Sequence, residues 1–291
     1  MRYLLSFLLL STYLFALISK PVHSKITSID EENQRVTISS VKGAQIGMYG
    51  VIVHHFTNSH SIALDWVKII STENNRIEAE MIPILALEQS ALPTGTWTPK
   101  VNDEVILGYN YHRALLIAPN PSIYKKVTDY HKERYWVHPD IFAANLSYNG
   151  HPSPLVEDFT QTCRANNIGI VAFVFDQSII SVDCQSFEII QNKSISEQTD
   201  EIQLPFYTRV TKIEASWFGE GSSEMKAYSP YYVNLLAESN PKNEWIQNYK
   251  QKLESKDKGS SWFSSWLPNV EVTIGDESYE DGFEKNHSSD K

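Results

Sequence analysis

The chain has 291 residues, and its 25 Lys and Arg against 35 Asp and Glu give a formal net charge of −10. Hydrophobic residues make up 42% of the sequence and charged residues 21%, a balance that predicts a folded protein with a sizeable core and excludes a wholly disordered chain. Phosphate binding requires clustered Lys and Arg, whereas the lysines here are scattered among acidic residues, which excludes nucleic acid as the main partner.

The N-terminus has the pattern of a cleavable secretory signal peptide over residues 1–24. Arg2 supplies a positive charge, residues 3–18 form an almost uncharged apolar run, and Val22 and Ser24 stand at the minus-three and minus-one positions of the predicted cleavage site. The apolar run is shorter than the roughly 20 residues of a spanning helix, which disfavours the alternative of an uncleaved anchor. No later apolar stretch is longer, so we expect no transmembrane segment in the mature chain.

Residues 25–108 predict a small β-barrel domain. Short segments with strand character alternate with turn-forming Asp, Asn, Ser and His, at Arg35–Ser40, Gly50–Phe56, Ile62–Ser71, Arg76–Pro83 and Glu104–Tyr109. Closure into a barrel is favoured because it removes exposed strand edges. Gly43, Gly47 and Gly50 lead into a strand and not into a helix, so they predict tight turns at a barrel corner and not a phosphate-binding loop.

Residues 109–192 have the mixed pattern of an α/β domain. Proline marks the expected first turn of a helix, and an uninterrupted apolar run marks a strand buried on both faces. The expected elements in chain order are a strand at Ala114–Ala118, a helix from about Pro121 to Tyr130, a helix from Pro139, a helix within Leu155–Asn166, a central strand within Ile168–Phe175 and a strand at Ile179–Cys184.

Residues 193–253 form an appendage rich in aromatic residues, which we expect to pack on the α/β domain. The polar stretch Gln191–Glu201 predicts a linker or exposed loop, and Tyr231–Lys252 predicts an interrupted helical stretch. Residues 254–291 have the composition of a disordered acidic tail. The fold class is therefore α+β: a small N-terminal β-barrel followed by an α/β domain with an aromatic-rich appendage.

The two cysteines, Cys163 and Cys184, predict a disulfide bond, since export places them in an oxidising compartment. Cys163 lies near the end of a helix on the same face as Phe159. The following two strands run out and back, so Cys184 is expected beside that helix terminus, and it shares the inward strand face of Val182. The alternative is a pair of buried free thiols.

The sequence offers only weak candidates for catalytic or metal-binding residues. His54 and His55 are adjacent on a strand and face opposite ways, so together with His60 they predict surface histidines and not a metal site. The sequence lacks the Gly-x-Ser-x-Gly and His-Glu-x-x-His motifs, so we expect neither an enzyme nor a cofactor. In the loop at residues 136–140 an aromatic ring, an imidazole and a carboxylate cluster before a helix; Asp140 either supports that turn or contributes to a binding site.

Several segments together resemble the N-terminal domain of the plasminogen-binding surface proteins of epsilon-proteobacteria. The resemblance covers roughly residues 25 to 230. The matching segments are Gly47–His54, Asp103–Tyr109, Leu115–Asn120, Trp136–Asp140, Glu157–Phe159, Val182–Phe187 and Ser216–Gly219.

This resemblance implies an exported cell-surface protein with a protein partner, namely host plasminogen, and a role in adhesion and virulence. In the family, binding to plasminogen kringles is attributed to a C-terminal lysine, and this sequence ends in Lys291, although its C-terminal segment is acidic and lacks the lysine-rich region of the family's longer members. The alternative is a periplasmic structural or assembly scaffold with no host ligand.

Overall fold

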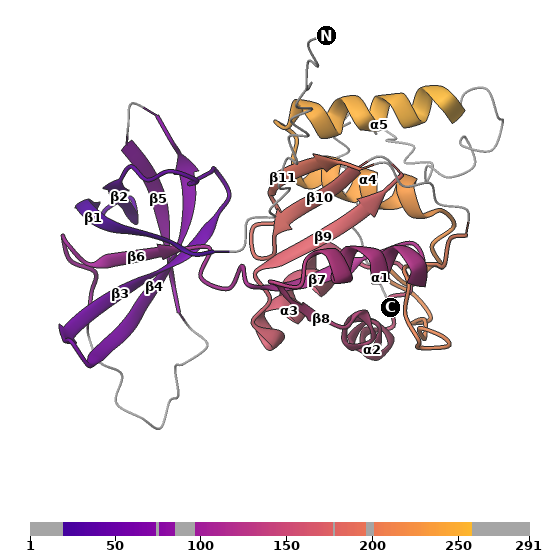
Figure 1. Cartoon of the computed structure of the whole chain (residues 1–291), viewed down its shortest axis with the longest axis horizontal. Coiled ribbons are helices and arrows are strands. Elements are labelled where there is room, and N and C mark those ends of the chain that lie inside the picture. The colour runs from indigo at the N-terminus through magenta and orange to yellow at the C-terminus, as the bar shows by residue number, and fades with distance from the viewer. Residues whose placement is uncertain (1–19, 74–75, 85–96, 177, 196–200, 258–291) are drawn as a thin grey trace, which may run out of the picture. The chain divides into compact units, whose positions relative to one another are not determined.

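The computed structural model describes residues 20–73, 76–84, 97–176, 178–195 and 201–257. Its N-terminal strands form a closed antiparallel barrel in the order β1-β2-β5-β4-β3-β6 (Figure 1). The strands are β1 (Val22–Asp30), β2 (Arg35–Ser39), β3 (Tyr49–Thr57), β4 (His60–Ser71), β5 (Arg76–Pro83) and β6 (Glu104–Leu107). The predicted β-barrel is confirmed.

Aliphatic side chains at alternate strand positions fill the barrel. Val105 and Leu107 of β6 are buried while Glu104 and Ile106 are half-buried, as the two-residue period of a strand requires. Gly43 and Gly47 lie outside the strands at φ values of 95° and 86°, as the turn prediction requires. Gly50 instead lies inside β3, where a Cβ atom would come within 2.7 Å of the Ile106 carbonyl oxygen, so this glycine permits the close pairing of β3 with β6.

Strand β1 closes the barrel and begins before the predicted cleavage site. Val22, His23 and Ser24 pair with Leu107, Ile106 and Val105 of β6. The predicted signal peptide, residues 1–24, therefore overlaps the first three residues of β1.

The second sheet has the strand order β11-β10-β9-β7-β8, with β7 parallel to β8 and β9 and the other neighbours antiparallel (Figure 1). Its strands are β7 (Arg113–Ile117), β8 (Tyr135–Val137), β9 (Ile170–Phe175), β10 (Ser178–Asp183) and β11 (Ile189–Ser194), and the intervening helices are α1 (Pro121–Tyr130), α2 (Pro139–Asn149) and α3 (Val156–Asn166). Strand β9 lies at the centre, as its apolar sequence predicts.

Helices cover both faces of this sheet. Ala172 and Val174 of β9 pack against Ile123 and Val127 of α1. Because side chains alternate along a strand, Phe173 points to the opposite face, where it packs against aromatic rings of the other helices. The sheet therefore forms the middle layer of the α/β region.

The appendage packs on the face of the sheet that carries Phe173. It contains α4 (Tyr228–Ser239) and α5 (Glu244–Asp257). Phe206 stacks on Phe142 of α2 with ring centroids 5.4 Å apart, and Tyr232 lies 5.3 Å from Phe173. The Tyr228 hydroxyl donates to the carbonyl oxygen of Ile117 at 2.8 Å, so aromatic side chains contribute both packing and hydrogen bonds. The α+β fold class is confirmed.

Two short elements differ from the sequence expectations. Gln191–Ser194 is not part of a linker but belongs to the edge strand β11. Among the described strands β11 pairs with β10 alone, and Ile190 is its one buried residue, so its composition remains polar. The three-residue strand β8 was not expected either. Helix α5 continues to Asp257, into the segment predicted to be a disordered tail, and residues 258–291 lie outside the described part of the chain.

Cys163 and Cys184 form a disulfide, with their Cα atoms 6.1 Å apart. The bond joins the last turn of α3 to the residue that follows β10, which is the arrangement that the strand periodicity predicts. Within the described residues, no helix has both the length and the apolar character needed to cross a membrane.

Candidate functional site

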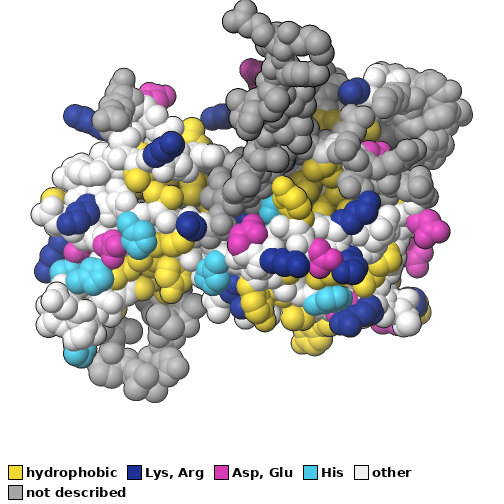
Figure 2. All heavy atoms as spheres, in the orientation of Figure 1, with side chains coloured by type: hydrophobic (Ala, Val, Ile, Leu, Met, Phe, Trp, Pro, Cys, Tyr) yellow, Lys and Arg dark blue, Asp and Glu magenta, His cyan; other side chains and the backbone are white. Residues whose placement is uncertain are grey.

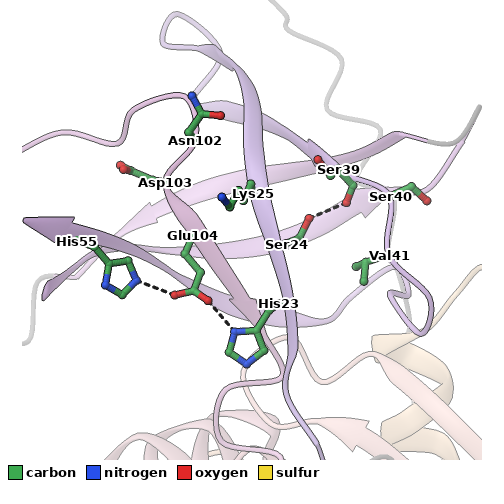
Figure 3. A pocket seen from close by; sticks show the side chains of 10 residues that line it. All are labelled: His23, Ser24, Lys25, Ser39, Ser40, Val41, His55, Asn102, Asp103 and Glu104. Atoms are coloured by element: carbon green, nitrogen blue, oxygen red, sulfur yellow. Dashed lines mark hydrogen bonds and ion pairs between the residues drawn. The ribbon is translucent and has the colours of Figure 1, made fainter. Parts of the chain in front are cut away.

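A polar pocket with a volume of about 620 Å³ opens on the barrel surface (Figure 3). It is formed by the start of β1, the turn after β2, one side chain of β3 and the start of β6. The lining residues are His23, Ser24, Lys25, Ser39, Ser40, Val41, His55, Asn102, Asp103 and Glu104. Most of these side chains can donate or accept hydrogen bonds, so the pocket suits a polar ligand group.

Glu104 bridges two histidines at this pocket. Its carboxylate oxygens lie 2.7 Å from His23 Nδ1 and 2.7 Å from His55 Nε2 (Figure 3). Glu104 pairs with Lys25 of β1 and with Val53 of β3. His23 is two residues before Lys25 and His55 two residues after Val53, so both lie on the same face as Glu104. The hydrogen bonds from His23 and then His55 lower the pKa of Glu104, which keeps its carboxylate ionised.

His54 contacts a different carboxylate from His55. Its Nδ1 atom lies 2.7 Å from Oδ1 of the buried Asp103, and Asp103 also accepts a hydrogen bond from the Lys100 backbone N–H at 2.8 Å. His54 and His55 therefore face opposite ways, as expected for adjacent residues of a strand. The sequence did not predict either carboxylate partner, because the pairing of β3 with β6 brings them to the histidines from about fifty residues away. The one feature that could have indicated them is the pair of adjacent acids, Asp103 and Glu104, at the start of an expected strand.

His60 lies apart from these two pairs, as the first residue of β4, where it hydrogen-bonds Thr57 and Ser59. Within the described ranges, no group of three or more His, Cys, Asp or Glu residues is arranged to hold a metal ion. The pocket therefore offers ionised and neutral hydrogen-bonding groups, and we assign it no catalytic step.

The loop at residues 136–140 is used internally. Asp140 accepts hydrogen bonds from the Thr208 hydroxyl at 2.8 Å, from the Arg209 backbone N–H at 2.8 Å and from Arg209 Nε at 2.6 Å. Partial burial raises the pKa of Asp140, but the hydrogen bonds that it accepts outweigh this and lower the pKa to about 2. The hydrogen bond from the Arg209 backbone contributes most to the lowering. Asp140 thus supports the turn and ties the appendage to α2, which was one of the two roles expected for it.

A buried carboxylate joins the barrel to the second sheet. Asp183, at the end of β10, accepts hydrogen bonds from the Tyr49 backbone N–H of β3 at 3.0 Å and from the Tyr111 hydroxyl at 2.7 Å. The Ser186 hydroxyl donates to the Gly47 carbonyl oxygen at 2.7 Å, and Lys68 of β4 pairs with Glu188 at 2.8 Å. Burial raises the pKa of Asp183, although the hydrogen bonds that it accepts act in the opposite direction. These contacts use Asp183 structurally.

The candidate partner-binding residue Lys291 lies outside the described residues. The barrel and the disulfide-linked α/β region define an α+β protein with a polar pocket on the barrel surface.

The chain belongs to the family described as "Plasminogen-binding protein pgbA N-terminal", whose model matches residues 21–236. It is 26% identical over 206 residues to the plasminogen-binding protein PgbA of Helicobacter pylori strain J99, an alignment that covers 70% of this chain and 45% of the relative. It is also 26% identical over 195 residues to the protein of that name from strain 26695, covering 66% of this chain and 42% of the relative. The chain thus spans less than half the length of these curated relatives. No solved structure matches it.

Proposed function

We propose that this protein is exported to the bacterial cell envelope and captures plasminogen at the cell surface. The observation that carries the proposal is the family match over residues 21–236, together with two relatives that are named as plasminogen-binding proteins. The proposed function is binding and not catalysis, in keeping with a polar pocket in which the Glu104 carboxylate is engaged by His23 and His55.

Export is supported by the N-terminal sequence and by the disulfide. Arg2 followed by the apolar residues 3–18 is typical of a secretory signal. The Cys163–Cys184 bond fits an oxidising compartment such as the periplasm or the cell surface and would be uncommon in the cytosol.

The proposed contact with plasminogen is made by Lys291. A groove that recognises an ammonium and a carboxylate together is filled by a C-terminal lysine, whereas an internal lysine lacks the carboxylate. The preceding residues Asn286–Asp290 are polar, which favours access to the terminus. Such charge-assisted contacts weaken with salt and are displaced by a free lysine analogue.

The test measures binding of the folded protein to immobilised plasminogen before and after removal of Lys291 by a basic carboxypeptidase. We expect a loss of about tenfold, in the range of a charge-assisted contact, with unchanged circular dichroism. Lys252→Ala is a matched control, because Lys252 is an exposed internal lysine of α5. Binding that survives verified trimming would remove the terminal-lysine mechanism.

A periplasmic scaffold without a host ligand is the second candidate, and the polar pocket on the barrel favours it, since that pocket offers a binding site unrelated to a terminal lysine. Protease accessibility on intact cells distinguishes the two. Cleavage by external protease supports surface capture, while protection until the outer membrane is opened, together with no binding to plasminogen, supports the scaffold.

A further inference from the structure

The loop between Glu214 and Ser223 presents two aromatic side chains to solvent. Trp217 is 100% exposed and Phe218 is 86% exposed. Tyr148, in the last turn of α2, is 92% exposed and lies close in sequence to the residues that hold this loop. Elsewhere in the same region Phe142 and Phe206 are fully buried, whereas these two rings are left in solvent.

The loop is fixed to α2 on its N-terminal side. The Ser216 backbone N–H donates to the Gly150 carbonyl oxygen at 2.9 Å, and the Ser216 hydroxyl donates to the Asn149 carbonyl oxygen at 3.2 Å. The Glu214 backbone N–H donates to the Ser147 hydroxyl oxygen at 3.1 Å. Gly150 has a φ of 75°, and any Cβ atom there would overlap with Ser216, so a glycine is required where α2 and the loop meet.

The loop is also fixed on its C-terminal side. The Ser153 backbone N–H donates to the Gly221 carbonyl oxygen at 3.1 Å, and the Ser153 hydroxyl donates to the Ser223 carbonyl oxygen at 2.6 Å. The Ser222 hydroxyl donates to the Gly219 carbonyl oxygen at 2.6 Å, which closes the turn after the two aromatic residues. Trp217 and Phe218 thus protrude from a loop whose backbone is held at both ends.

An exposed Trp-Phe pair on a loop that is held at both ends is suited to binding a protein. Interface residues that contribute most to affinity are enriched in aromatic side chains, and a loop that is already ordered loses little conformational entropy on binding. Large exposed apolar groups that the core does not use commonly mark such interaction sites.

The shape and charge of the loop restrict its partner. A protruding pair of rings needs a concave apolar surface to be buried. Glu214 is paired with Lys212 at 3.3 Å, so the acidic charge beside the two rings comes from Glu220 and Glu224, which follow them in sequence. These two acids disfavour an anionic lipid surface and match a basic rim, because like charges repel at close range.

We propose that Trp217 and Phe218 insert into an apolar pocket with a basic rim on plasminogen, as a second contact independent of Lys291. This inference rests on the proposed function, which supplies the partner. The folded region then binds through its own surface, and the terminal lysine adds to that contact.

The experiment measures binding to immobilised plasminogen, with and without a saturating free lysine analogue, for the full chain and for the variant Trp217→Ala/Phe218→Ala. Tyr130→Ala is the matched control, because Tyr130 is a 65% exposed aromatic residue at the end of α1, remote in sequence from the loop. We expect the double variant to bind about tenfold more weakly both with and without the analogue, as for other exposed aromatic interface residues. The control should bind normally, and all forms should share one melting temperature.

Equal binding by the double variant and the control would overturn this inference and leave the proposed function standing. Absence of plasminogen binding by every form would overturn the proposed function and this inference with it. A third measurement tests whether the protein sediments with vesicles of phosphatidylcholine and phosphatidylglycerol. If the unaltered chain sediments with them and Trp217→Ala/Phe218→Ala does not, the loop binds lipid and the inference is overturned.

Discussion

The barrel and the α/β region build their cores in different ways. The barrel is filled by aliphatic side chains from strands that all lie within residues 22–107, and alternation along each strand decides which side chains point inward. The core beside β9 is a network of aromatic rings contributed by residues as distant in sequence as Phe142 and Tyr232. Local pattern therefore accounts for the barrel, whereas the α/β core depends on contacts that no local pattern encodes.

The largest expected effect tests the aromatic network. Phe173 is fully buried, and its ring centroid lies 5.5 Å from that of Phe159 and 5.3 Å from that of Tyr232. We expect Phe173→Ala to lower the free energy of unfolding by about 4 kcal/mol, since it removes apolar burial and leaves a cavity between layers. Denaturant unfolding followed by near-ultraviolet circular dichroism measures this.

The exposed Tyr130 again supplies the control, because Tyr130→Ala should change stability by less than about 0.5 kcal/mol. If Phe173→Ala lowers the free energy of unfolding by less than about 1 kcal/mol, the surrounding rings can close the cavity. The aromatic network would then not be the feature that distinguishes the α/β core from the barrel core.

The same contrast explains how much the sequence could predict. The alternation of Val36 and Ile38 and the apolar run at β9 are local, and each predicted its strand. The edge strand β11 was missed because only Ile190 is fully buried in it, so no alternating pattern remains to be read. At the pocket, His23 and His55 were visible as histidines, but their common partner Glu104 was not, because its position depends on the register of β6 between two other strands.

The second prediction concerns the closure of the barrel. A chain that starts at Lys25 lacks Val22, His23 and Ser24, and so loses three of the four residue pairs that join β1 to β6. We expect such a chain to be less stable than one starting at Lys20 by about 2–3 kcal/mol, at about 1 kcal/mol for each residue pair lost. Thermal unfolding of the two purified chains measures the difference.

It follows that processing should leave β1 intact. We propose that cleavage of the exported protein occurs before Val22 and not after Ser24, and the intact mass of the exported protein locates the cut. A mature N-terminus at Lys25 together with equal stability of the two chains would show that the barrel does not need this part of β1.

The third prediction tests the link between the appendage and α2. Asp140→Asn weakens the hydrogen bonds with Thr208 and Arg209 by removing the charge, and we expect a loss of about 1–2 kcal/mol at neutral pH. The pKa of Asp140 falls from 3.8 to about 2 on folding. Its ionised form therefore stabilises the fold above pH 4, and this contribution is lost as the pH falls from about 4 to about 2.

Stability measured at steps across this pH window should fall less in Asp140→Asn than in the unaltered protein. Asp176→Asn is the control, because Asp176 is an exposed residue that follows β9. Identical pH profiles for Asp140→Asn and the unaltered protein would contradict the assignment of Asp140 as the tie to the appendage.

The smallest expected effect concerns Glu104, which spans three barrel strands through His23 and His55. The side chains of His23 and His55 are 58% and 52% exposed, so solvent and salt screen these contacts. We expect Glu104→Gln to lower the free energy of unfolding by less than about 1 kcal/mol, and by still less in 1 M salt. Because folding lowers the pKa of Glu104, the contribution of its carboxylate is present at neutral pH and diminishes as the pH falls through the pKa of the folded state. A salt-independent loss above 2 kcal/mol would show instead that this polar bridge, together with the aliphatic core, holds the barrel closed.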